Sequence, residues 1–224
     1  MVASHFGPHG LSVEQLKSAL RSGVCPSDES FDAFLPDDLR RVSARYWTPL
    51  LVAMRLARWL APLGVQHVVD IGSGPGKLCV AAALSGNARF TGIEHRPRLV
   101  RAATALAATF GVSDRVCFRQ GAMADEPLPL ADAYYLFNPF GENLYDSDDH
   151  LDDEVELSKS RYARDVHATD QLLEGAHVGT ILVTYNGYGG TVPVSYREIR
   201  LNRHLPEVLR MWQKVALDPP VSPP

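Results

Sequence analysis

Ten consecutive residues, 68–77, constrain the fold of this chain more than any other feature, because they read Val-Val-Asp-Ile-Gly-Ser-Gly-Pro-Gly-Lys. The segment Val65–Ile71 is short, apolar and β-branched, as expected of a buried strand. Glycines follow at alternate positions, and the apolar stretch Lys77–Leu84 is typical of a helix. Glycines between a strand and a helix let a ligand approach the backbone where a side chain would block it. The sequence therefore predicts a ligand-binding turn inside a βα unit.

The spacing of these glycines separates two classes of ligand. Dinucleotide-binding loops read G-x-G-x-x-G, which would place the third glycine at position 77, but that residue is Lys77 and the glycine is Gly76. Asp70 precedes the first glycine by two residues, and it suits a cationic amine better than a pyrophosphate, which it would repel. An NAD-dependent oxidoreductase is therefore the less favoured alternative. Lys77 itself is either a solvated side chain or a ligand contact.

Strand and helix signals alternate from residue 65 onward, which predicts a mostly parallel α/β sheet. The expected parallel strands are Val65–Ile71, Arg89–Glu94, Val116–Gln120, Ala133–Asn138 and Thr180–Tyr185. Two further strands, Tyr196–Asn202 and Val208–Val215, are expected to close the sheet as an antiparallel pair. The expected helices are Ser12–Arg21, a longer region over Asp37–Leu60, Lys77–Leu84, Pro97–Phe110 and Leu151–Leu173.

Composition and length set the remaining boundaries. We expect an N-terminal helical extension over 1–60, an α/β domain over 61–217 and a disordered, proline-rich tail over 218–224. The net charge of −4 gives no general electrostatic case for binding nucleic acid. The three cysteines lack C-x-x-C spacing, which argues against a disulfide framework or a zinc site. We find no signal-peptide pattern and no apolar run of the ~18–20 residues that span a membrane, so a cytoplasmic protein is expected.

The run at 68–77 resembles motif I of the class I, seven-strand S-adenosylmethionine (SAM) methyltransferases. The resemblance extends over about residues 45–217. It implies a Rossmann-like sheet of seven mostly parallel strands with helices on both faces, an antiparallel C-terminal pair and an N-terminal helical extension. It also implies SAM as cofactor, with S-adenosylhomocysteine as product. The loop residues Gly72, Ser73, Gly74 and Gly76 would then face the methionine part of SAM, and Asp70 its ammonium group.

Three further positions complete the cofactor site that the resemblance implies. Glu94 ends the second strand, where a carboxylate can accept both ribose hydroxyls, and His95 follows it beside the adenine. The family commonly has an acid after the third strand for the adenine amino group. Here the acid is displaced to Asp125 or missing, so Ala122 and Met123 are expected to contact the ring.

Thr48 is a candidate on the N-terminal side of the domain. In many relatives the segment before the first strand caps the carboxylate of SAM. A threonine followed by a proline is also a good helix N-cap with proline at the first helical position. Thr48 is therefore expected either to contact the cofactor or to cap the helix that begins at Pro49.

The acceptor side is expected at Asn138-Pro-Phe, which ends the fourth strand. It resembles motif IV of enzymes that methylate amino nitrogens of adenine, cytosine or glutamine, [N/D]-P-P-[Y/F], but lacks one proline, which disfavours a nucleobase. The order Arg45-Tyr-Trp-Thr-Pro, Asp70-Ile-Gly-Ser-Gly, Gly92-Ile-Glu94, then Asn138 before Phe140 is similar to the seven-strand lysine methyltransferases of the telomeric-silencing-disruptor type. Asn138 would touch both donor and acceptor, Phe140 would wall the acceptor pocket, and Tyr185 would be a further catalytic-site residue.

An acidic segment follows this motif and bears on the partner. Residues 142–156 hold eight acidic side chains, and no second strand end supplies matching metal ligands, so we assign no metal. The segment is either a lid that attracts a cationic acceptor or a solvated loop. The function predicted is methyl transfer from SAM to a nitrogen or oxygen of a protein side chain or small molecule. A SAM-binding protein without turnover, acting as a sensor or partner subunit, is the alternative. The oligomeric state is left open.

Overall fold

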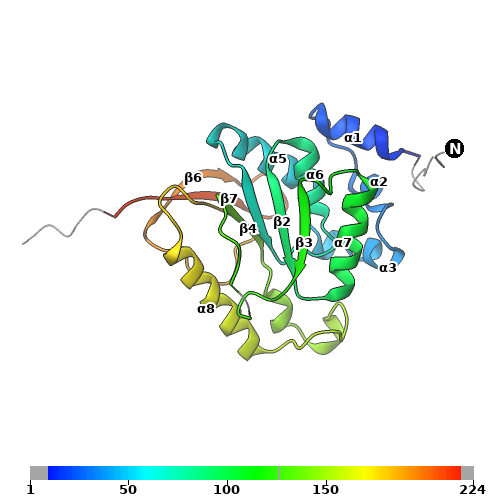
Figure 1. The fold of residues 1–224 in the computed structure, drawn as a ribbon. Coiled ribbons are helices and arrows are strands. Elements are labelled where there is room, and N and C mark those ends of the chain that lie inside the picture. Colours follow the sequence, from blue (N-terminus) through cyan, green and yellow to red (C-terminus); the bar gives the residue numbers. More distant parts are fainter. Residues whose placement is uncertain (1–9, 126, 218–224) are drawn as a thin grey trace, which may run out of the picture.

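A seven-stranded sheet runs through the molecule in the computed structural model, which describes residues 10–125 and 127–217 (Figure 1). The expected tail over 218–224 lies outside the described residues. The strands are β1 His67–Ile71, β2 Arg89–Glu94, β3 Val116–Gln120, β4 Ala133–Phe137, β5 Ile181–Tyr185, β6 Tyr196–Asn202 and β7 Leu209–Lys214. The helices are α1 Val13–Arg21, α2 Asp28–Asp32, α3 Asp37–Arg41, α4 Ser43–Tyr46, α5 Leu50–Leu60, α6 Lys77–Ser85, α7 Pro97–Thr109 and α8 Lys159–Gly175.

The strand order is β3-β2-β1-β4-β5-β7-β6. Strands β1 to β5 are parallel, whereas β7 pairs antiparallel with both β5 and β6. This arrangement confirms the predicted Rossmann-like sheet with an antiparallel C-terminal pair. The order reverses between β1 and β4, which makes the carboxyl ends of these strands the expected place for a ligand.

Alternation along the strands sends side chains into two cores. On one face, Val68 belongs to a first hydrophobic cluster with residues of α1, α5, α6 and α7. On the other face, Val69 belongs to a second cluster that includes Leu173 of α8. Figure 1 shows the N-terminal helices, in blue, on the far side of the molecule from α8, in yellow. Leu16 and Phe31 are fully buried in the first cluster, so the N-terminal helices share a core with the sheet. No helix of the described residues is long and apolar enough to cross a membrane.

Strand limits follow the predictions closely, with local exceptions. The bounds of β2, β3 and β6 are those predicted, while β1 begins at His67 rather than Val65. The fourth strand ends at Phe137, one residue earlier than predicted, because Asn138 has a φ of 38°, which no strand residue adopts.

The helical region expected over Asp37–Leu60 is broken into α3, α4 and α5. Trp47 takes an extended conformation (ψ 140°), and Pro49 is also extended (ψ 147°). The interpretation of Thr48 as the helix N-cap is wrong, because Pro49 occupies that position without a side-chain bond. Asp28 of α2 accepts a hydrogen bond from the Leu50 N–H instead (2.9 Å). The N-terminal helices therefore satisfy the start of α5.

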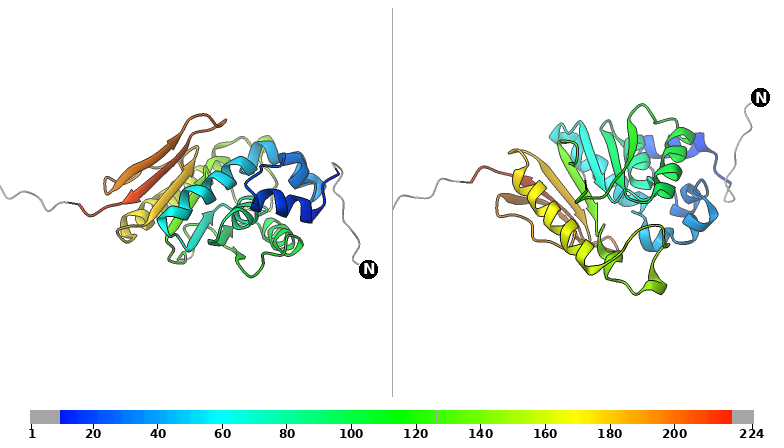
Figure 2. Two further views of the ribbon diagram at one scale, coloured as in Figure 1. Left: turned by 90° about the horizontal axis from the view of Figure 1, so that it is seen from above. Right: turned by 60° about the horizontal axis from the view of Figure 1, so that its bottom comes forward.

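The helix expected over Leu151–Leu173 begins later, at Lys159. The hydroxyl of Ser158 accepts a hydrogen bond from the Arg161 N–H (3.1 Å) and caps this helix, α8. Residues 141–158, which we call the lid segment, contain two 3-10 turns, η2 Gly141–Leu144 and η3 Ser147–Asp149. The right-hand view of Figure 2 shows this yellow-green segment beside the light blue N-terminal helices, to which Tyr46 joins it by donating to the Asp149 carbonyl (2.8 Å).

Candidate functional site

A cavity of about 280 Å³ lies at the carboxyl ends of the parallel strands. Residues after β1, β2, β3 and β4 line one side of it, and Arg45–Trp47 and the lid segment line the other. Eight of the residues predicted from the sequence line this cavity: Gly72, Gly74, Glu94, His95, Ala122, Met123, Asn138 and Phe140. Parallel strands bring these positions together because their carboxyl ends meet at one edge of the sheet.

The glycine loop approaches its neighbours so closely that side chains are excluded. A Cβ atom on Gly72 would lie 2.7 Å from the Cβ of Pro139, and one on Gly74 would lie 2.8 Å from the Trp47 ring. Both residues have positive φ, 78° and 54°, which other residue types rarely adopt. Trp47 is fixed in turn, because its ring N–H donates to the Leu39 carbonyl (2.9 Å). The loop is thus a bare backbone cradle at the floor of the cavity.

Glu94 is a buried carboxylate in the wall of the cavity, with 6% of its surface exposed. One oxygen accepts the Gly74 N–H (3.0 Å) and the other accepts the Arg96 N–H (2.9 Å). Burial raises the pKa of Glu94, and the Arg96 backbone bond opposes that rise. A carboxylate has about four acceptor positions, so this one still has capacity for ligand hydroxyls. The two backbone bonds fix its orientation beside the glycine loop.

Replacing Glu94 by Gln is expected to weaken S-adenosylhomocysteine binding by about 1.5–3 kcal/mol, the range for hydrogen bonds to a charged group. An amide nitrogen donates and does not accept hydrogen bonds. The variant therefore loses one of the two backbone hydrogen bonds and the acceptor for one ribose hydroxyl. Titration calorimetry of the variant beside Glu14→Gln, a surface control, measures the difference. Unchanged affinity in a folded Glu94→Gln protein would mean that the ribose is held elsewhere.

His95 is neutral at physiological pH. Burial and the nearby Arg96 lower its pKa to about 4. Its Nε2 lies 3.0 Å from Nη1 of Arg96, and the guanidinium can only donate, so Nε2 is the acceptor and Nδ1 carries the proton. His95 thus presents an uncharged ring to the cavity, which suits a flat heterocycle better than a charged group.

An acid that the sequence did not indicate lies beside the residues that follow β3. Asp125, the displaced candidate, points to Arg161 (2.9 Å) and does not line the cavity. Asp165, from the first half of α8, is 3% exposed, lines the cavity and accepts the Ala124 N–H (3.1 Å). No local sequence pattern indicates Asp165, because it lies some forty residues after Ala124, on α8, which packs against the sheet face of the second cluster. It stands close to Ala122 and Met123, where relatives commonly carry an acid.

Asn138 and Phe140 both line the cavity beside the lid segment. Asn138 departs from strand geometry, and its N–H donates to the Gly187 carbonyl (3.0 Å), which joins the ends of β4 and β5. Asn186 on the neighbouring strand end also has positive φ (59°) and also lines the cavity. Two non-glycine residues in the left-handed region therefore meet at one rim, a kind of strain that concentrates at functional sites. Asn186-Gly187 is a turn dipeptide, which could have signalled it.

Five predicted site residues are absent from the cavity wall: Thr48, Asp70, Ser73, Gly76 and Tyr185. The hydroxyls of Thr48 and Tyr135 bond to each other (3.0 Å) below the site. The Tyr185 hydroxyl accepts the Glu207 N–H (3.1 Å) while its ring is buried in the first cluster. Glu207, which the sequence did not indicate, lines the cavity instead.

Asp70 points away from the cavity, toward α6. It is 3% exposed and accepts a hydrogen bond from the Cys79 thiol (3.3 Å). Alternation explains this direction, since Asp70 shares a strand face with Val68, which packs in the first cluster. Burial raises the pKa of Asp70 to about 7 from an ordinary value of 3.8.

This shift predicts a pH dependence of stability. Between pH 8 and 6 the native Asp70 takes up a proton that the unfolded chain does not bind, so this group adds to the free energy of unfolding as the pH falls. Asp70→Asn removes that contribution. We expect urea unfolding at pH 8 and pH 6 to show a larger gain on acidification for the natural protein than for Asp70→Asn. Equal gains in the two proteins would show that Asp70 does not titrate in this range.

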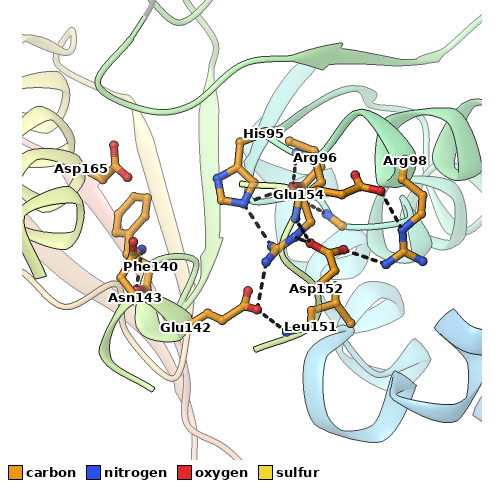
Figure 3. Close-up of polar contacts among 12 residues, drawn as sticks. His95, Arg96, Arg98, Phe140, Glu142, Asn143, Leu151, Asp152, Glu154 and Asp165 are labelled. Atoms are coloured by element: carbon orange, nitrogen blue, oxygen red, sulfur yellow. Dashed lines mark hydrogen bonds and ion pairs between the residues drawn. The ribbon is translucent and has the colours of Figure 1, made fainter. Parts of the chain in front are cut away.

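Arginines pair with part of the acidic segment (Figure 3). Arg96 contacts Glu142 (2.9 Å) and Asp152 (2.8 Å), and Arg98 contacts Asp152 (2.7 Å) and Glu154 (3.4 Å). These ion pairs hold the segment against the start of α7. The sequence around Arg96 does not indicate this role, because ion pairs with residues some fifty positions away leave no local signal.

Comparison with known proteins agrees with this geometry. A family model described as a methyltransferase domain matches residues 65–141. An RNA methyltransferase from Salinibacter ruber, solved in complex with S-adenosyl-L-homocysteine, is 25% identical; the match covers 78% of this chain and 97% of that one, with a TM-score of 0.52. No curated protein matches the chain.

Two further solved structures share the fold at lower identity. A putative O-methyltransferase from Klebsiella pneumoniae is 12% identical over 90% of this chain and 96% of that one (TM-score 0.57). An O-methyltransferase family 2 protein from Planctomyces limnophilus, in complex with apigenin, is 16% identical over 84% and 66% (TM-score 0.55). The family match over residues 65–141 and the fold shared with these structures support transferase activity with SAM as the cofactor.

Proposed function

We propose that this methyltransferase transfers the methyl group of SAM to a nitrogen or oxygen of a protein side chain or small molecule. The observation that carries the proposal is the Glu94 carboxylate, buried at the end of β2 and fixed by the glycine-loop backbone beside the cavity. The bare cradle of Gly72 and Gly74 and the neutral ring of His95 fit the same cofactor. An NAD enzyme is disfavoured because β7 runs antiparallel between β5 and β6.

Each group in the cavity has a distinct part in this proposal. When bound, SAM supplies a methyl group that is already activated on a sulfonium. Glu94 is proposed to accept the ribose hydroxyls, and Asp165 with Ala122 and Met123 to form the adenine end. The chain's remaining task is to orient the acceptor and to exclude water from it. A strong general base is therefore not required.

The acceptor is proposed to bind near Asn138 and Phe140. The Asn138 amide oxygen can accept an N–H or O–H of the acceptor, and the Phe140 ring excludes water from that side. A second cavity of about 300 Å³ shares Asn186 with the first and has Tyr188 and Trp212 in its wall, which leaves room for the body of an acceptor. Glu207 adds an exposed carboxylate at the rim. A lysine-type amine, as the sequence pattern implies, is one candidate, and a hydroxyl is the other.

Transfer is tested by incubating the purified protein and SAM with two fractions of a cell lysate, its proteins and its small molecules. A SAM-dependent gain of about 14 daltons, the mass of one CH₂, in either fraction identifies the acceptor class. The Glu94→Gln protein serves as the control. SAM binding without a modified product in either fraction would favour a sensor or partner subunit instead.

Phe140→Ala separates a pocket wall from a core residue. If the ring contacts the acceptor, the variant should keep its S-adenosylhomocysteine affinity and lose turnover through poorer positioning. Phe140 also packs in the second cluster, so emptying its place is expected to cost about 3–5 kcal/mol of stability. Melting temperature, cofactor affinity and turnover per folded molecule are measured together. Normal turnover in the folded fraction would remove Phe140 from the acceptor site.

A further inference from the structure

The lid segment closes the cavity with little backbone support of its own. Its regular structure consists of the two short 3-10 turns, η2 and η3, within the described residues. Glu142, Asn143, Tyr145 and Leu151 of the segment line the cavity. Side-chain contacts with the rest of the protein therefore decide whether this wall of the cavity is in place.

Arg96 supplies the buried contacts, as Figure 3 shows. Its side chain is 4% exposed. Nη2 donates to Oε1 of Glu142 (2.9 Å) and Nε donates to Oδ1 of Asp152 (2.8 Å), while Nη1 lies 3.0 Å from His95. The same oxygen of Glu142 accepts the Leu151 N–H (2.6 Å). One guanidinium thus binds two points of the lid segment that are ten residues apart.

The Asp152 carboxylate of the lid segment is ionised in this arrangement. Burial alone would raise the pKa of Asp152, but hydrogen bonds from Arg98 and Arg96 lower it overall. An arginine forms such a two-carboxylate contact better than a lysine, because its planar fork presents several donors in fixed directions.

Arg96 also contacts the proposed cofactor residue. Its backbone N–H donates to Oε1 of Glu94 (2.9 Å), whose other oxygen holds the Gly74 N–H (3.0 Å). The lid segment is also held by Arg98, through Asp152 and Glu154, and by Arg45, which is half exposed and lies 3.2 Å from Asp149. An exposed pair of that kind is weak and screened by salt. Among these arginines, Arg96 is the one that contacts both Glu94 and the lid segment.

We propose that Arg96 is a positioning residue that couples cofactor binding to closure of the lid segment, an inference that rests on the proposed function. Cofactor held by Glu94 favours the position of Arg96 in which its guanidinium binds Glu142 and Asp152. Linkage makes this effect reciprocal: the factor by which bound cofactor favours the closed lid is also the factor by which the closed lid raises the affinity for cofactor. Breaking the guanidinium contacts weakens cofactor binding although Arg96 is not one of the cofactor residues proposed above.

The test compares Arg96→Lys with Arg98→Lys, which makes the same change two residues away. Arg98 contacts Asp152 (2.7 Å) but neither Glu142 nor Glu94, and it does not line the cavity. Calorimetry with S-adenosylhomocysteine should give about a tenfold or greater loss of affinity for Arg96→Lys and a change within about twofold for Arg98→Lys. Glu142→Gln, which leaves Arg96 paired with Asp152, should show an intermediate loss in a protein that keeps its fold.

The rate of limited proteolysis measures directly how often the lid segment opens. A glutamate-specific protease can cut after the exposed Glu154 and Glu156 only when the segment opens. S-adenosylhomocysteine should slow this cleavage in the natural protein and in Arg98→Lys, but not in Arg96→Lys at a saturating concentration. If Arg96→Lys binds S-adenosylhomocysteine as tightly as the natural protein does and is protected from cleavage to the same extent, the coupling is overturned while the proposed function stays intact. Absence of S-adenosylhomocysteine binding by the natural protein would instead overturn the proposed function.

Discussion

Lys77→Met is expected to lower the free energy of unfolding by about 3–5 kcal/mol, the cost of removing one partner from a buried ion pair. Lys77 is neither a solvated side chain nor a ligand contact, because it is 2% exposed and points into the N-terminal helices. Its Nζ lies 2.6 Å from Asp28, 2.9 Å from Asp32 and 3.2 Å from the Ser43 hydroxyl. The variant leaves Asp32 buried without its cation.

Urea unfolding measures this loss, with Lys159→Met as a surface control that should stay within about 0.5 kcal/mol of the natural protein. The double variant Lys77→Met with Asp32→Asn should recover part of the loss, because the uncompensated buried charge is then removed. A Lys77→Met protein as stable as the control would mean that the N-terminal helices do not depend on this cluster. Since Lys77 opens α6 directly after the glycine loop, the cluster also anchors the proposed cofactor cradle.

Gly74→Val is expected to abolish detectable S-adenosylhomocysteine binding. A Cβ at this position would approach the Trp47 ring to 2.8 Å, and a β-branched residue is strongly disfavoured at a φ of 54°. The clash must displace either Trp47 or the loop, and both form the cavity wall. The loss therefore arises from a collapsed cradle rather than from a side chain in the ligand's path.

Gly64→Val provides the matched control for this prediction. Gly64 also has positive φ (68°), but a Cβ there meets no atom within 4 Å. The control carries the backbone strain without the clash, so its affinity should equal that of the natural protein even if its melting temperature falls. Calorimetry on both folded variants gives the comparison. Binding retained by Gly74→Val would place the ligand away from the glycine loop.

The sheet could be predicted because its signals are local. Each apolar, β-branched run and each glycine turn lies within a few residues, so β2, β3 and β6 have the predicted bounds. The prediction of one helical region before β1 is wrong at Trp47 and Pro49, where tertiary contacts interrupt a continuous apolar pattern. There the Trp47 ring packs on the glycine loop, a contact that no periodicity encodes.

Only the part of the candidate site that glycine turns and strand ends define could be predicted from the sequence. Glycines and strand ends mark positions such as Gly74, Glu94 and Asn138, and the parallel sheet brings them together. The motif around Asp70 predicts a contact with the ligand, whereas strand alternation turns this side chain toward α6. Arg96 and Asp165 gain their places through contacts across forty to sixty residues, so no local pattern could indicate them.

Calorimetric titration of the natural protein with S-adenosylhomocysteine, and separately with NAD, tests the central claim most directly. The account predicts saturable binding of S-adenosylhomocysteine at micromolar concentrations and no heat of binding with NAD. Binding of NAD without binding of S-adenosylhomocysteine would contradict it.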